Sequence, residues 1–224
     1  MHVPIPNLDL AAYAERDVLT PFHDLLLTLH DEEHQSGSPD VLPCFRELVE
    51  DDDRSPEVDA ALVPWLLRYI WQTPCAAYTQ HGWRALQSIV EDPESLADHA
   101  LQVFLHHPHG LARAEVIAIS GGGNPAYTEE PAFLEAVLHA AQTDPSPTVR
   151  AASWAFLRYQ DALGKEHLPL LCAGLFDLAT EVRVEVSDGL RELYLRDDAE
   201  AQSARRDAQE AALHDPTNGW ILHR

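Results

Sequence analysis

The chain has 224 residues, 46% of them hydrophobic, and a globular chain of this size buries on the order of 70% of its unfolded surface. Its 37 acidic residues against 15 lysines and arginines give a formal net charge of −22 with neutral histidines. A field of this sign repels phosphate backbones and anionic membranes. The balance therefore disfavours nucleic acid and membrane partners and favours basic proteins, unless it serves solubility alone.

Residue usage indicates a source and a compartment. All basic residues except Lys165 are arginines, which is typical of a GC-rich, bacterial genome. The start, MHVPIPNLDL, lacks the basic and apolar regions of a signal peptide, and no apolar run approaches the roughly 18 residues of a membrane span. The cysteines Cys44, Cys75 and Cys172 form no C-x-x-C motif. We therefore expect a cytoplasmic protein, with Cys172 buried in the apolar run 168–176.

Apolar residues recur at helical spacing along most of the chain, and no segment reads as strand-rich. In chain order, the pattern predicts a short helix over 8–16, five pairs of helices, and a last helix over 198–213. The five pairs are 20–33/39–50, 56–72/75–91, 94–106/109–120, 131–143/146–160 and 167–178/180–196.

The last two pairs share a short sequence at the start of their second helices. Residues 144–150 and 177–183 both read D-x-x-x-x-V-R, and Val149 and Val182 are 33 residues apart. Similar spacings towards the N-terminus predict the positions equivalent to Val149, which are Leu111, Tyr78 and Val41. The residues that then stand in place of the arginine are Ala112, Thr79 and Leu42.

The shared sequence has a structural meaning. The aspartate, or a following serine or threonine, can accept hydrogen bonds from free amides at the helix start. The valine begins the buried stripe, and the arginine can reach the acidic residue in the turn of the neighbouring repeat. The residues predicted to face the core in the last two pairs are Phe133, Leu134, Val137, Leu138, Val149, Ser153, Phe156, Leu157, Leu170, Leu171, Leu175, Val182, Val186, Gly189, Leu190 and Leu193.

The second-helix segments DPSPTVRAASWAFLRY and DLATEVRVEVSDGLREL resemble those of short bacterial HEAT repeats, most clearly over residues 130–196. The signatures of tetratricopeptide and ankyrin repeats, which have similar periods, are absent. The resemblance implies an all-α, HEAT-like α-solenoid, a right-handed superhelix of about five antiparallel helix pairs. One domain would span 1–224, with the helices 8–16 and 198–213 as caps.

The stretch LHDEEHQ contains the pattern H-x-x-E-H, with His30 and His34 as its histidines. In zinc proteases with this pattern, the histidines bind the metal and the glutamate activates water. Such a site needs a third ligand from a large α/β domain, which the all-helical pattern does not provide. Because residues 35–39 read as a helix end, where histidines interact favourably with the helix dipole, we expect no catalytic metal.

A second histidine-rich stretch, FLHHPHG, contains His106, His107 and His109, with His99 on the same helical face as His106. Histidine clusters can bind Zn²⁺ or Ni²⁺. The proline and glycine of the stretch favour a polar turn between helices instead, so we expect neither a metal nor a cofactor. The weak metal candidates of the chain are His30, His34, His106 and His107.

The resemblance implies that the second helices line the concave, binding face of the stack. The candidate acidic stripe lies on the last of them, at spacings of 4, 3 and 4, and consists of Glu181, Glu185, Asp188 and Glu192. Trp83, Trp154 and Arg158 are further candidates, because aromatic residues and arginines anchor interfaces. The two tryptophans can equally belong to the core between repeats. Other second-helix residues expected to be exposed are Arg46, Glu50 and Gln87.

These patterns favour a non-catalytic protein-binding scaffold whose partner is a basic protein, with an immunity protein that neutralises a secreted toxin as one possibility. The resemblance leaves two enzyme classes open, namely phycobilin lyases and HEAT-like DNA glycosylases. The second class binds DNA along a basic groove, which a chain of charge −22 does not favour.

Overall fold

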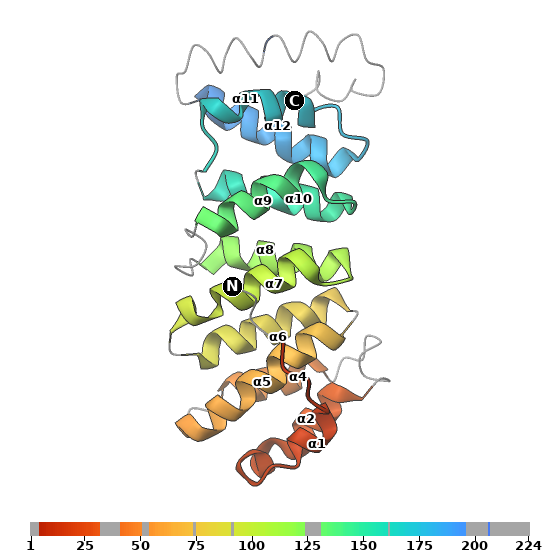
Figure 1. Cartoon of the computed structure of the whole chain (residues 1–224), viewed down its shortest axis with the longest axis vertical. Helices are drawn as coiled ribbons and strands as arrows, with labels where there is room; N and C mark the ends of the chain where they lie inside the picture. The colour runs from red at the N-terminus through yellow and green to blue at the C-terminus, as the bar shows by residue number, and fades with distance from the viewer. Residues whose placement is uncertain are drawn as a thin grey trace. The chain divides into compact units, whose positions relative to one another are not determined.

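The structure is a computed structural model that describes residues 5–31, 41–50, 54–73, 75–90, 92–123, 131–160, 162–195 and 206. These residues form eleven α-helices and several short 3-10 helices, with no strand among them (Figure 1). The chain divides into two compact units, Met1–Thr128 and Glu129–Arg224. The all-α prediction is confirmed for the described residues, whereas a single domain over 1–224 stays a prediction.

The helices of the first unit form a row of packed pairs. They are α1 (Leu10–Ala14), α2 (His23–His30), α4 (Val41–Glu50), α5 (Pro56–Gln72), α6 (Ala76–Ile89), α7 (Ala97–His106) and α8 (Gly110–Gly123), with the 3-10 helices η1 (Asp17–Phe22) and η2 (Pro93–Leu96). Helix α5 packs on α6 and α7 on α8, and the short connections make each pair antiparallel. Helix α6 also contacts α4 and α8, so the second helices of successive pairs lie side by side.

The second unit repeats this arrangement. Its helices are α9 (Pro131–Thr143), α10 (Pro147–Tyr159), α11 (Leu168–Gly174) and α12 (Thr180–Leu195), with the 3-10 helix η4 (Lys165–His167) before α11. Helix α9 packs on α10, α11 packs on α12, and the second helices α10 and α12 pack on each other (Figure 1). The helices of all five predicted pairs are confirmed within the described ranges. The helix predicted over 198–213 lies outside them, apart from residue 206.

The starts of the long helices follow from local sequence. Ser55 caps α5 by accepting a hydrogen bond from the backbone N–H of Val58 at 3.4 Å, and Pro56 occupies the first helical position. Proline is favoured there because its missing N–H would have no partner in the helix. Pro147 likewise begins α10.

The predicted core of the second unit is largely confirmed. The predicted residues that are buried are Phe133, Val137, Val149, Ser153, Phe156, Leu157, Leu171, Leu175, Val182, Val186, Gly189, Leu190 and Leu193. Leu134, Leu138 and Leu170 are half-buried. Gly174 lets α11 approach α12 closely, because a Cβ atom at this position would lie 2.8 Å from Cγ2 of Val186.

The predicted register of the third pair is wrong by one residue. Leu111 is 54% exposed, whereas Ala112 is fully buried, as Val149 is. Arg113 Nη1 donates to the carbonyl oxygen of His107 at 2.7 Å. Arg150 makes the same contact with the carbonyl of Asp144, six residues before it. The third pair therefore has its arginine at Arg113, and the sequence period could not decide between two adjacent apolar residues.

The expectation that Cys172 is buried is also wrong. Cys44, Cys75 and Cys172 are all half-buried, and none of them forms a disulfide. Helix α11 is short, and Leu168 and Leu171 occupy the side of it that faces the core. Cys172 follows Leu171 and lies at the flank of this side.

Candidate functional site

An arginine connects the two second helices of unit 2. Arg158, near the end of α10, donates from Nη2 to Glu185 at 3.0 Å and from Nη1 to Glu192 at 2.8 Å. Its guanidinium carbon also lies 4.5 Å from the centroid of the Tyr159 ring. The Arg158 side chain is only 13% exposed, so water screens these ion pairs less than it would screen a surface pair. Arg158 is therefore a structural link between α10 and α12 rather than a free surface anchor.

This link changes the nature of the predicted acidic stripe, which we call the α12 acidic face (Glu181, Glu185, Asp188 and Glu192). The Glu185 and Glu192 carboxylates are bound to Arg158, and Asp188 lies 3.4 Å from Arg191 on the same helix. Glu181 is exposed. Four carboxylates and two guanidiniums leave a local formal charge of −4 + 2 = −2.

The two tryptophans proposed for the binding surface lie in the core. Trp83 is fully buried in α6, and Trp154 is 1% exposed in α10. Large aromatic side chains on the packed side of a helix contribute mainly to the core. Both tryptophans therefore belong to the core, which was the alternative to a place on the binding surface. Within its own unit, neither side chain is exposed to a partner.

The histidine candidates do not converge. His30 is in the last turn of α2, and His34 lies outside the described residues. His106 is exposed, but His107 is 1% exposed, and its Nε2 lies 3.1 Å from the carbonyl oxygen of Ile70. Within the described ranges, no three histidine, cysteine or acidic side chains are grouped as a metal site would require.

The contacts of His107 define its tautomer. The N–H of His109 donates to Nδ1 of His107 at 3.2 Å, so Nδ1 is unprotonated and Nε2 carries the hydrogen that it donates to Ile70. Burial lowers the pKa of His107 below its usual value, and the nearby His109 and Arg113 lower it further, against the backbone hydrogen bonds. His107 therefore stays neutral near pH 7 and joins the α7–α8 turn to α5.

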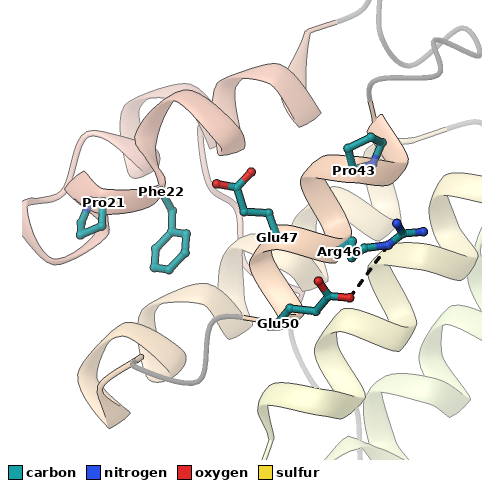
Figure 2. Close-up of a pocket in the computed structure, with 6 residues that line it drawn as sticks. All are labelled: Pro21, Phe22, Pro43, Arg46, Glu47 and Glu50. Atoms are coloured by element: carbon teal, nitrogen blue, oxygen red, sulfur yellow. Dashed lines mark ion pairs between the residues drawn. The ribbon is translucent and has the colours of Figure 1, made fainter.

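A hollow of about 440 Å³ opens between η1 and α4, and we call it the η1–α4 hollow (Figure 2). Its lining residues are Pro21, Phe22, Pro43, Arg46, Glu47 and Glu50. Figure 2 shows the Glu47 side chain extending from α4 towards Phe22 on η1. Arg46 lies 4.0 Å from Glu50, and both side chains are at least 65% exposed, so this ion pair is weak.

The sequence indicates only part of this hollow. Arg46 and Glu50 were expected on the exposed side of a second helix, and both are exposed. Phe22, Pro21 and Glu47 were missed, because nothing in the sequence indicates that η1 and α4 line one hollow. The spacing of Glu47 and Glu50, three residues apart on a helix, was the one available signal.

A second hollow of about 630 Å³ lies between α5, the end of α6 and the start of α7. Arg54 on its edge is bound to Asp59 by an ion pair of 2.7 Å. His99 also lines it, and burial lowers the pKa of His99 against the raising effect of Asp98. The single arginine here is already paired, so this hollow indicates no ligand class.

Comparison with protein-family models, curated proteins and solved structures finds no match. The HEAT resemblance therefore stays an expectation. Within the described ranges, no helix combines the length and the apolar character needed to cross a bilayer.

Proposed function

We propose that the chain is a non-catalytic protein-binding scaffold, built as a HEAT-like α-solenoid, and that its acidic second helices bind a basic protein. The arrangement in each unit supports the solenoid, because α4, α6 and α8 contact in order in one unit and α10 contacts α12 in the other. Stacks of helix pairs of this kind create extended surfaces that bind other macromolecules.

One observation carries the choice of partner. The α12 acidic face keeps a charge of −2 after Arg158 and Arg191, which form ion pairs with it, are counted, and the whole chain has a formal charge of −22. Complementary charge accelerates association and selects against partners of like charge. A basic protein, of which a secreted toxin is one kind, fits this surface best.

The test begins with capture of partners from the native host and their identification by mass spectrometry. The affinity of a purified partner is then measured at several salt concentrations for the wild type and for Glu181→Gln/Asp188→Asn. We expect a basic partner, weaker binding as salt rises, and weaker binding of the variant. The matched control is Glu135→Gln/Glu166→Gln, which also removes two charges, from exposed glutamates of α9 and η4 rather than of α12.

Two results would contradict the proposal. One is an affinity that neither salt nor the α12 variant changes, because the acidity would then not contribute to binding. The other is retention of duplex DNA in a gel shift at low salt, which would favour the glycosylase-like alternative.

A further inference from the structure

We propose that His107 is a pH-sensitive latch, which holds the α7–α8 turn against the end of α5 and releases it in mild acid while the helices stay folded. This inference goes beyond the proposed function and does not depend on it. It concerns the first unit alone, whereas the α12 acidic face belongs to the second.

His107 is the single buried anchor of the turn. Of the seven positions from 105 to 111, it is the one with a buried side chain, which is 1% exposed. The other positions are exposed or half-buried, and they are Leu105, His106, Pro108, His109, Gly110 and Leu111. The turn can therefore move away from α5 without unpacking any other side chain of its own.

The neutral form of the ring closes the latch. Its Nε2 donates to the carbonyl oxygen of Ile70 at 3.1 Å, and its Nδ1 accepts from the N–H of His109 at 3.2 Å. The ring also packs on Trp71 of α5, with 5.2 Å between the ring centroids. One nitrogen donates and the other accepts, an arrangement that exists only in neutral imidazole.

Protonation removes the acceptor. It adds a hydrogen at Nδ1, which then faces the N–H of His109, so that two donors oppose each other. The Ile70 carbonyl is already bonded to Nε2 and offers nothing to the second donor. A charge on a side chain that water does not reach is costly unless it is paired.

The groups around His107 do not pair such a charge. Helix α5 contributes the Ile70 carbonyl and the uncharged Trp71 ring. The turn contributes His109, whose ring centroid is 5.6 Å away, and α8 contributes Arg113, whose Nη1 donates to the His107 carbonyl at 2.7 Å. Among the described residues, the charged groups that act on His107 are these two bases, and both oppose its protonation.

Opening the turn relieves this conflict at a small cost. Moving the ring into water breaks two hydrogen bonds and one ring contact, all of them made by His107. Helix α8 still packs on both α6 and α7, so the third helix pair stays joined to the second. Openings of this kind, which involve few buried contacts, need less free energy than unfolding of the whole unit.

The test follows the backbone N–H of His109, whose acceptor is the latch itself. Its exchange with water is measured by NMR on the full ¹⁵N-labelled chain from about pH 7.5 to about pH 5, on both sides of the usual histidine pKa. Each rate is divided into the rate of an unstructured peptide at the same pH, which gives a protection factor. The factor should fall below about pH 6.5, by at most about tenfold per pH unit for one proton.

Two further measurements show that the release is local. Amides in the middle of α5 and α8 should stay far better protected than the His109 amide at every pH. Far-ultraviolet circular dichroism should show the same helix content over the range in which the His109 amide loses protection.

Three variants separate His107 from its neighbours. In His107→Gln the side chain keeps a donor and an acceptor but does not titrate, so the protection of the amide at position 109 should no longer depend on pH. His106→Gln removes an exposed histidine, and His109→Gln removes the nearest imidazole. Both should keep the pH dependence of the wild type, because the titrating ring at position 107 remains.

Three results would overturn the latch. The first is an unchanged protection factor of the His109 amide between about pH 7.5 and about pH 5 in the wild type. The second is a pH dependence that persists in His107→Gln or disappears in His106→Gln. The third is a loss of helix content at the same pH as the loss of protection, because the unit would then unfold as a whole. The first and third are measured on the wild type, so they do not require any variant to fold.

Discussion

Arg150, in the first turn of α10, donates two hydrogen bonds of 2.8 Å to the two carboxylate oxygens of Asp177, in the turn before α12. Both side chains are 15% exposed. This is the contact between a repeat's arginine and the turn acid of its neighbour that the shared sequence predicted. Asp177 also accepts from the N–H of Ala179 at 2.9 Å, so one carboxylate orders the turn and joins two repeats.

We expect Asp177→Asn to lower the free energy of unfolding by about 1.5 to 3 kcal/mol, because it weakens hydrogen bonds to a charged, mostly buried arginine. Urea unfolding measures the change. The control is Asp188→Asn, whose partner Arg191 is 49% exposed, and it should cost less than about 1 kcal/mol. Equal effects of the two variants would contradict the structural role of Asp177.

The Arg150–Asp177 ion pair also predicts that the free energy of unfolding depends on pH. Partial burial raises the pKa of Asp177, but the hydrogen bonds from Arg150 outweigh this effect, and the pKa is lower than its usual value of 3.8. A depressed pKa means that the stabilisation is complete above about pH 4 and is lost as pH falls through the folded-state pKa. In Asp177→Asn the loss of stability below pH 4 should be smaller than in the wild type, as denaturant unfolding at each pH would show.

The burial of Trp154 predicts an effect on stability. Trp154→Ala should reduce the free energy of unfolding by about 3 to 5 kcal/mol, because it leaves a cavity in the core. Leu178→Ser is the control in the same unit, since Leu178 is 97% exposed, and it should change stability by less than about 0.5 kcal/mol. A Trp154 variant that unfolds like the wild type would place this side chain outside the core.

The burial of His107 predicts that the chain loses stability in mild acid. Its pKa is lower in the folded chain than the usual 6.5, so the folded state binds fewer protons than the unfolded state as pH falls below 6.5. The free energy of unfolding should therefore fall in this range, by at most about 1.4 kcal/mol per pH unit for one histidine. His107→Gln, which cannot be protonated, should show a shallower pH dependence.

The neighbouring residue provides the control for this experiment. His106 is exposed, and His106→Gln should keep the pH dependence of the wild type. His81 and His99, whose pKa values burial also lowers, are retained in both variants and cancel in the comparison. Identical pH profiles of all three proteins would show that His107 does not contribute.

The close approach of Gly174 to Val186 predicts that substitutions at these two positions have non-additive effects on stability. A Cβ atom there would lie 2.8 Å from Cγ2 of Val186, so Gly174→Ala should destabilise the chain by about 1 to 3 kcal/mol, as overpacking does. Val186→Ala removes that methyl group. In the double variant, the cost of Gly174→Ala should shrink or disappear, and a double-mutant cycle from urea unfolding measures the difference. Additive effects would mean that the close approach is relieved elsewhere.

The buried and exposed faces of α12 were determined by the sequence alone. On α12, Glu181, Glu185 and Asp188 were expected in a stripe beside the core stripe that contains Val182 and Val186. The structure buries both valines and leaves Glu181 exposed, with Glu185 and Asp188 half-buried. The sequence predicts these positions correctly because the 3.6-residue period of a helix determines which residues share a side. The helix boundaries also follow from local signals, such as Ser55 and Pro56 before α5.

The contacts of these faces were decided only by the tertiary structure. Arg158 meets Glu185 and Glu192, which are 27 and 34 residues away in sequence, and this converts two acids of an expected binding stripe into internal partners. His107 meets Ile70, 37 residues away, although the adjacent His106 is exposed. Phe22 of η1 and Glu47 of α4, 25 residues apart in sequence, line the same hollow. Periodicity describes one helix at a time, whereas burial and charge pairing depend on which helix packs against it.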